Sequence, residues 1–367
     1  MSAGLEIQLI AVVVAVACAL PGVFLVLRGM AMMSDAISHT VLLGIVLAFF
    51  LAGDMESPWL MLGAAVTGVL TVSLVELINK TGLVKQDAAI GLVFPALFSL
   101  AVILISRYAR GVHLDVDAVL LGELAFAPFD RLVVWGLDLP RSLVVMGVIL
   151  ALNVLLIGLF YKELKLSTFD AGLAATLGFM PVVLHYGLMT MVSLTAVGAF
   201  DAVGSILVVA LMIAPAATAF LLTRRLSYML GLAALIAAVS AVSGYWLAHW
   251  LDSNIAGSMA TMSGVWFTAA LLFAPEQGVV ATLWRRRRQK WEFSQTMLAI
   301  HLLHHENTAV ADLESRVDHL WEHMRWQPTF AEQVVRYAER KGLVRRRAGR
   351  LWLTDEGRTV AEKALLS

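Results

Sequence analysis

Two side chains that could bind a metal ion stand four residues apart, at Asp35 and His39 in the stretch RGMAMMSDAISHTVLLGIVLAFF, residues 28–50. On an α-helix, residues i and i+4 lie on one face, one turn apart. A carboxylate and an imidazole in that arrangement are the oxygen and nitrogen ligands that Mn²⁺, Fe²⁺ and Zn²⁺ accept. The alternative is that Asp35 caps a helix N-terminus and His39 is a packed core histidine. The spacing therefore predicts a metal site or a structural pair.

Other chemistry is sparse. The sequence contains no nucleotide-binding loop of the form G-x-x-x-x-G-K-[ST], so ATP-driven work would need an ATPase on another chain. We find no Ser–His–Asp or paired-carboxylate constellation, and we do not expect an enzyme. Cys18 is the only cysteine, which excludes an internal disulfide and a thiolate cluster. Asp201 is interpreted as a helix cap or as a residue lining a cavity, and His185 as a packing histidine.

The C-terminal region carries a second set of candidates. Residues 336–350 contain seven Lys/Arg against Glu339 alone, a pattern suited to phosphate groups. Residues 291–367 nevertheless balance 11 Lys/Arg with 11 Asp/Glu, so a protein-docking or sensing module is favoured over DNA binding. In HLLHHE, residues 301–306, the histidines have metal-capable spacing at 301/304 and 301/305, with solvated surface histidines as the alternative.

The elements that must position these residues are apolar helices. The chain of 367 residues is 60% hydrophobic and 15% charged, whereas soluble domains carry about 25% charged residues. A helix that crosses a membrane needs about 20 apolar residues. Such segments are predicted at 5–27, 33–52, 58–78, 88–106, 141–160, 180–198, 202–222, 227–250 and 258–274. We expect nine spans, or eight if the break at Phe200 and Asp201 is not a true loop.

The distribution of positive charge predicts the orientation, because cytoplasmic loops are enriched in Lys and Arg. With the N-terminus outside, the inner face receives the Arg285–Arg288 run, which also suits anionic lipid. On that inner face, YKELKLSTFDAGLAATLGF is predicted to form a short helix with Ser167 or Thr168 as N-cap and Gly178 as its end. In the outer break 107–140 we expect an interfacial helix that includes Asp115, Asp117 and Glu123.

The composition changes after Pro275. We expect a transmembrane domain at 1–284 and a cytoplasmic domain at 285–367. The second domain shows helical patterns near 294–305, 309–324 and 328–341, then two short strands around a basic turn and a last helix. This is the order of a winged helix-turn-helix. The predicted fold class is an all-α polytopic membrane protein with a small winged-helix tail.

Four motifs resemble those of the permeases of zinc/manganese/iron ABC transporters, in the same order: the stretch around Asp35 and His39, KQDAAIGLVFPALFSLAVILIS, YKELKLSTFDAGLAATLGF and AVGSILVVALMIAPAATA. The resemblance covers about residues 5–275. The tail, in GLVRRRAGRLWLTDEGRTVAEKAL, resembles the winged-helix domain of iron-dependent (DtxR-like) regulators.

The resemblance implies a subunit of a metal importer in the bacterial inner membrane, working by alternating access. Asp35 and His39 match the family's Asp-x-x-x-His pair, which contacts the transported Mn²⁺, Zn²⁺ or Fe²⁺, and no permanently bound cofactor is implied. The cytoplasmic coupling helix corresponds to Tyr161–Gly178, with contact residues Glu163, Leu166, Phe169, Asp170, Leu173 and Gly178.

The partners implied are a cytoplasmic ABC ATPase dimer, a second permease subunit, identical or paralogous, an extracytoplasmic metal-binding protein and membrane lipid. Nucleic acid is not expected as a partner. Two other functions remain open from the sequence. One is a permease for an organic metal chelate of the cobalamin or siderophore type, and the other is a membrane-tethered DNA-binding regulator.

Overall fold

The chain folds into two units, each with its own hydrophobic core. The computed structural model describes residues 3–53, 57–108, 124–134, 137–308, 311–320 and 324–366. Contacts separate Met1–Gly278 from Val279–Ser367. Helix α12 (Val279–His305) runs unbroken through the four arginines, so the boundary expected after Trp284 falls inside a helix.

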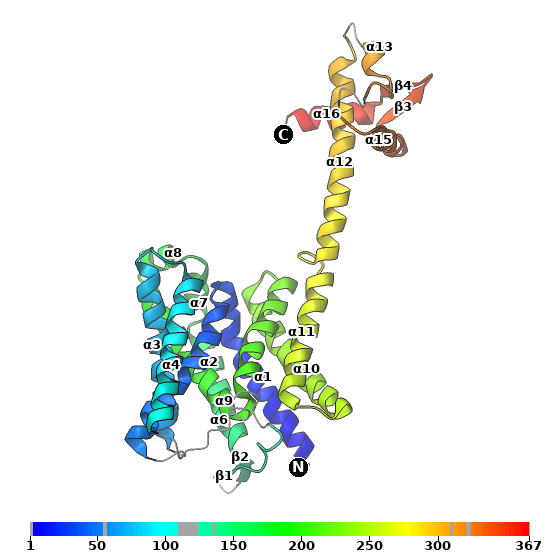
Figure 1. Cartoon of the computed structure of the whole chain (residues 1–367). Helices are drawn as coiled ribbons and strands as arrows, with labels where there is room; N and C mark the ends of the chain where they lie inside the picture. Colours follow the sequence, from blue (N-terminus) through cyan, green and yellow to red (C-terminus); the bar gives the residue numbers. More distant parts are fainter. Residues whose placement is uncertain are drawn as a thin grey trace. The chain divides into compact units, whose positions relative to one another are not determined.

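The first unit is a bundle of long apolar helices (Figure 1). Its elements are α1 (Ala3–Leu27), α2 (Ala31–Ala52), α3 (Pro58–Lys80), α4 (Gln86–Tyr108), β1 (Arg131–Val134), β2 (Leu137–Pro140), α6 (Arg141–Leu159), α7 (Tyr161–Phe169), α8 (Ala171–Thr176), α9 (Pro181–Leu222), α10 (Leu226–Leu251) and α11 (Ile255–Phe273). Within the described residues, nine helical segments are long and apolar enough to cross a membrane. This agrees with the number of spans predicted from the sequence.

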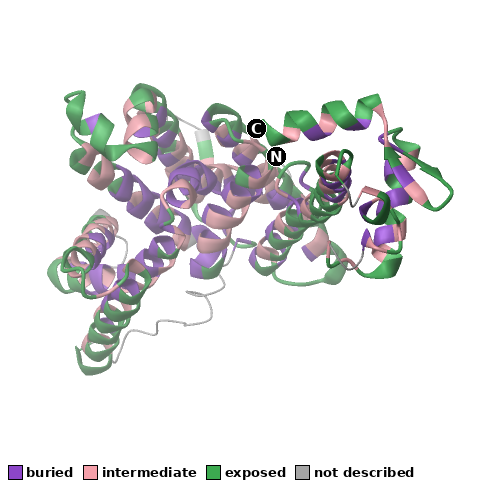
Figure 2. Ribbon diagram, turned by 90° about the horizontal axis from the view of Figure 1, so that it is seen from above, coloured by how far each residue is buried: buried purple, intermediate pink, exposed green. Residues whose placement is uncertain are grey.

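Helix α1 forms the centre of the bundle. It packs against α6, α9 and α10, and Val14, Cys18 and Val23 on it are fully buried. Buried residues line the facing sides of the helices, whereas exposed residues lie on their outward sides (Figure 2). The outward side chains include many large apolar residues. This pattern is expected where a helix bundle meets lipid rather than water.

Helix α9 reverses direction in its middle. Asn153 donates from Nδ2 both to the carbonyl oxygen of Ala17, 3.0 Å, and to Thr195 Oγ1, 2.9 Å, which places Thr195 beside Ala17 of α1. Met212 packs against Gly22, only five residues further along α1. In a straight helix Thr195 and Met212 would be about 26 Å apart. The chain turns back at Gly204, whose φ of 76° and ψ of 164° suit glycine alone.

Two helices therefore occupy the range of α9, Pro181–Phe200 and Ala202–Leu222. The break predicted at Phe200 and Asp201 lies within four residues of the reversal. The side chain of Asp201 is outside the part of the chain that the structure describes, so its expected role as a cap or cavity residue stays a prediction.

The hairpin β1–β2 is a feature that the sequence did not predict. Its strands are antiparallel, with Leu132 opposite Leu139. Arg131 fastens it, because its guanidinium lies 2.8 Å from Asp138 of β2 and 3.3 Å from Glu6 of α1. The interfacial helix expected around Asp115 lies outside the described residues.

The second unit is small and mixed. Its described residues include α12, α13 (Ala311–Glu314), α15 (Pro328–Arg340), the antiparallel strands β3 (Val344–Arg347) and β4 (Arg350–Leu353), and α16 (Asp355–Leu365). Its core joins Leu298 and Leu302 of α12 to Val334 and Val335 of α15 and to Leu351 of β4.

The helix expected over 309–324 is wrong for the described part of that range. In that part, α13 is followed by turns and a bridge residue over 315–319, and Leu320 is helical again, so the expected single helix is interrupted. The carbonyl oxygen of Ser315 accepts a hydrogen bond from the Leu351 N–H at 2.8 Å. The backbone of Arg316 forms an isolated antiparallel β-bridge with that of Arg350. Backbone groups that pair with β4 in this way are not available for a helix.

The contact between Gly22 and Met212 yields a test of the packing. A Cβ atom at Gly22 would overlap the Met212 carbonyl oxygen, which is backbone and cannot rotate away. We predict that Gly22→Ala lowers the stability of the detergent-purified protein by about 1–3 kcal/mol, the usual penalty of overpacking. The thermal unfolding midpoint measures the change. Gly147→Ala in α6, where a Cβ would meet open space, is the matched control. Equal midpoints for the two variants would contradict this account of the packing.

Candidate functional site

Asp35 and His39 lie side by side on α2. His39 Nε2 is 3.5 Å from Asp35 Oδ1, and their side chains are 33% and 36% exposed, respectively. Helix α2 begins at Ala31 after Met30, so Asp35 is not its N-cap. With a rise of 1.5 Å per residue, His39 lies about 12 Å along α2 from its first residue. The pair is therefore inside a candidate span and only partly covered by protein.

Neighbouring helices fix the pair on two sides. The imidazole of His39 stacks on Phe94 at 5.5 Å between ring centroids and meets the edge of Phe98 at 5.9 Å, both on α4. On the side of α3, Thr71 Oγ1 donates to Thr40 Oγ1 at 2.7 Å. The rotation of α2 about its axis is thereby set, and with it the direction of Asp35 and His39.

Glycines make the close packing of α2 on α3 possible. Gly44 and Gly63 face each other, and a Cβ on either would overlap the backbone oxygen of the other. Small residues at a helix crossing let two backbones approach where apolar solvent provides no hydrophobic drive. The sequence shows that each helix contains a glycine, but only the fold shows that Gly44 and Gly63 contact each other.

The geometry suits transient metal binding. One carboxylate and one imidazole supply two ligands, fewer than the four to six that Zn²⁺ or Mn²⁺ takes in a closed protein site. Water or other groups would complete the coordination shell, and such a site releases its ion readily. An ionisable pair inside a span is costly unless it serves a pathway.

A polar cluster joins four segments at the other end of α1 from the N-terminus. Arg28 donates from Nη2 to Ser167 Oγ at 3.1 Å and from Nε to Thr168 Oγ1 at 3.2 Å, both near the end of α7. Its Nη1 lies 3.1 Å from His185 Nδ1 on α9. Burial lowers the pKa of the Arg28 guanidinium, but an arginine in a protein keeps its charge.

Glu76 on α3 completes the cluster. His185 Nε2 lies 2.5 Å from Glu76 Oε1, and Tyr186 Oη donates to Glu76 Oε2 at 2.8 Å. Arg28 has only donors, so Nδ1 of a neutral His185 accepts, and its N–H on Nε2 faces the carboxylate. Sequence reasoning interpreted His185 as a packing residue and did not single out Glu76. An acidic residue in an apolar run was the available signal.

The segment after α6 forms two helices, α7 and α8, rather than one. Asp170 is the N-cap of α8, where its Oδ1 accepts from the Leu173 N–H at 2.8 Å. The expected capping by Ser167 or Thr168 is wrong, because both lie inside α7 and accept hydrogen bonds from Arg28. Gly178 follows α8 with a φ of 85°, which agrees with its expected role as a stop.

Large apolar side chains are exposed along this segment. We define the α7–α8 patch as Phe169, Leu173, Leu177 and Met180, which are 47–68% exposed. Figure 1 shows α7 and α8 at the end of the bundle opposite the β1–β2 hairpin. Of the other residues expected here, Glu163 lies in the first turn of α7 and Leu166 is half-buried on it.

Comparisons with known proteins show the family of this chain. The zinc transport system membrane protein TroD of Treponema pallidum (strain Nichols) is 52% identical over 361 residues, 98% of each chain. The manganese transport system membrane protein MntD of Bacillus subtilis (strain 168) is 51% identical over 270 residues, 73% of this chain and 91% of that protein. The structure of PsaBC from Streptococcus pneumoniae in complex with Fab matches with a TM-score of 0.64 and 30% identity, covering 76% of this chain and 94% of that chain. The model of the ABC 3 transport family matches residues 5–274. The chain therefore belongs to the ABC 3 transport family.

Proposed function

We propose that this chain is the membrane permease subunit of an ATP-driven importer for divalent metal ions such as Zn²⁺ or Mn²⁺, and that the ion passes Asp35 and His39. The observation that carries the proposal is the half-exposed pair, 3.5 Å apart inside α2, in a chain of this family. Similar chains are named for zinc and for manganese transport. Its work is transport rather than catalysis.

Two protein ligands suit a transported ion better than a complete cage. A translocation site must bind strongly enough to admit the ion and weakly enough to release it. Asp35 supplies negative charge and His39 an imidazole nitrogen, a combination that Mn²⁺, Zn²⁺ and Fe²⁺ all accept. A permease for an organic chelate would not need an ionisable pair, whereas here the two groups lie one turn apart and are held by α3 and α4.

We propose that the α7–α8 patch is where a cytoplasmic ABC ATPase docks. The patch lies between two candidate spans, α6 and Pro181–Phe200, in the segment that carries Lys162 and Lys165 on the face predicted to be inside. A cluster of exposed apolar residues at one end of a helix bundle is typical of a protein interface. A second permease subunit and an extracytoplasmic binding protein would complete the importer in the inner membrane.

Arg28 provides a route from that surface to the bundle. It holds Ser167 and Thr168 of α7 and also His185, which in turn faces Glu76 of α3. A displacement of α7 by the ATPase is thus passed to the ends of α1, α3 and α9 through charged contacts. In alternating access, these ends would separate on one side of the membrane while the other side closes around the ion.

For the tail, we propose a cytoplasmic domain over residues 285–367 with a winged-helix fold like that of DtxR-like regulators. The order α12, α13, α15, β3, β4 and the antiparallel β3–β4 hairpin support it. Two of its basic side chains form ion pairs within the unit, Arg346 with Glu332 and Arg350 with Asp312. This favours docking or sensing over DNA binding.

The ion pathway is tested by removing each ligand. We predict that Asp35→Asn and His39→Ala each reduce uptake of ⁵⁴Mn²⁺ or ⁶⁵Zn²⁺ by at least about tenfold, because even groups that only orient metal ligands contribute 10–100-fold. His249→Ala, at the end of α10 against Trp246, is the control and should transport normally. Immunoblots check that membrane levels are equal. Wild-type uptake in both pair variants would remove Asp35 and His39 from the pathway.

Docking is tested by placing a charge in the patch. We predict that Leu173→Glu reduces by about tenfold or more the co-expressed ATPase that purifies with the chain, since loss of an interface anchor is worth roughly 2 kcal/mol or more. Leu83→Glu is the matched control, because Leu83 is an exposed leucine in the loop between α3 and α4. Retention of the ATPase by Leu173→Glu, or equal loss in the control, would argue against docking at this patch.

A further inference from the structure

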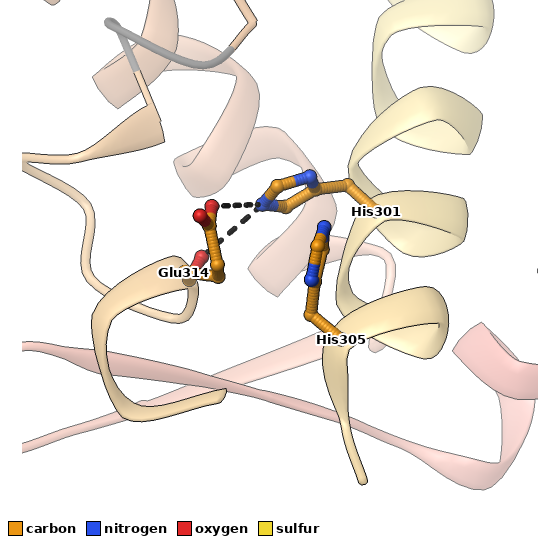
Figure 3. A group of neighbouring side chains, drawn as sticks. All are labelled: His301, His305 and Glu314. Carbon is orange, nitrogen blue, oxygen red and sulfur yellow. Dashed lines mark hydrogen bonds and ion pairs between the residues drawn. The ribbon is translucent and has the colours of Figure 1, made fainter. Parts of the chain in front are cut away.

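The second unit contains a cluster of metal-ligand side chains that the transport function does not use (Figure 3). His301 and His305 stand four residues apart on α12, and Glu314 ends α13. One donor atom from each of the three lies within 4.8 Å of the others. Figure 3 shows the two imidazoles and the carboxylate turned toward a common space between α12 and α13.

We propose that His301, His305 and Glu314 form a binding site for a divalent late first-row metal ion, with Zn²⁺ as the best match. Two imidazoles and one carboxylate are a ligand set that Zn²⁺ adopts in proteins with a fourth position left open. Imidazole-rich sites favour Zn²⁺, Fe²⁺ and their neighbours over Mg²⁺ and Ca²⁺, which select oxygen ligands.

The distances are close to those of an occupied site. Ligands about 2.0–2.1 Å from a tetrahedral Zn²⁺ are about 3.4 Å from one another. His301 Nε2 lies 3.4 Å from Glu314 Oε2 and 3.2 Å from the Glu314 carbonyl oxygen. Because the carbonyl oxygen only accepts, Nε2 donates in the metal-free chain and would release its proton when it binds an ion. The ligand atom of His305 also lies within 4.8 Å of those of His301 and Glu314.

Burial supports a site rather than a surface pair. His301 is 8% exposed and Glu314 6% exposed. A carboxylate taken out of water requires strong compensation, which a divalent cation supplies better than a neutral imidazole. The carboxylate is presented by α13, a helix of only four residues.

The other oxygen of the carboxylate is also engaged. His319 Nε2 lies 3.5 Å from Glu314 Oε1, so Oε2 remains directed at His301. His319 is thus a positioning residue, of the kind that orients a metal-ligating carboxylate. A bound ion would tie α13 to α12, and Ser315, the next residue, accepts the hydrogen bond from Leu351 of β4. Occupancy of the site would therefore stabilise the pairing of this segment with β4.

The test measures metal binding to the full-length chain that carries Asp35→Ala and His39→Ala, so that the proposed transport pair cannot contribute. Zn²⁺ affinity is measured in competition with a chromophoric indicator, and Co²⁺ absorption reports the coordination. We expect one Zn²⁺ per chain and intense visible Co²⁺ bands of a tetrahedral site. Glu314→Gln, which keeps the shape of the side chain, and His301→Ala should each weaken binding at least about tenfold.

His304→Ala is the matched control, because His304 is an exposed histidine on the same turn of α12. It should bind Zn²⁺ like the parent chain. Absence of Zn²⁺ binding in the parent, unchanged affinity in Glu314→Gln, or an equal loss in His304→Ala would each overturn the proposal. If His301→Ala unfolds the tail, Glu314→Gln and His305→Gln decide the matter. None of these outcomes bears on transport past Asp35 and His39.

Discussion

The hydrocarbon interior of a membrane offers no water to an ionisable group, and the placement of Asp35 and His39 follows from that constraint. A carboxylate and an imidazole inside a span persist where they face each other, a pathway or a partner. Here they lie 3.5 Å apart on α2. The crossing of α2 with α3 at Gly44 and Gly63 and the aromatic rings of α4 hold α2 in the orientation that leaves both groups half-exposed. The neighbouring helices thus fix the direction of the two side chains that we propose as metal ligands.

The second requirement of a driven transporter is a mechanical connection, and we propose that the charged cluster at Arg28 provides it. Arg28 is half-buried, carries a fixed charge and offers donors in several directions, so one side chain can join α7 to His185 of α9. Glu76 extends the connection to α3. The polar groups of the cluster are hydrogen-bond or ion-pair partners of one another, so separating them would leave polar groups without partners. We therefore expect the segments that the cluster joins to move together. The apolar α7–α8 patch is the surface through which we propose that a partner acts.

Much of this architecture could be predicted from the sequence, because hydropathy and spacing are local properties. The nine spans, the break near Asp201 and the pairing of Asp35 with His39 belong to this class. What could not be predicted depends on contacts between distant segments. Examples are the link of Arg28 to α7, the pairing of Ser315 with β4 that prevents a longer helix, and the gathering of Glu314 with the histidines of α12. A single sequence without homologues does not show which distant residues meet.

The central claim is that a metal ion is coordinated directly by His39 and Asp35 on its way through the bundle. Pulsed EPR of Mn²⁺ bound to the purified permease tests this most directly, because a coordinated imidazole nitrogen gives a resolved hyperfine coupling. In a chain that lacks His301 and His305, the account predicts a ¹⁴N coupling that disappears when His39→Ala is added. A Mn²⁺ signal without nitrogen coupling, or one unchanged by His39→Ala, would contradict it.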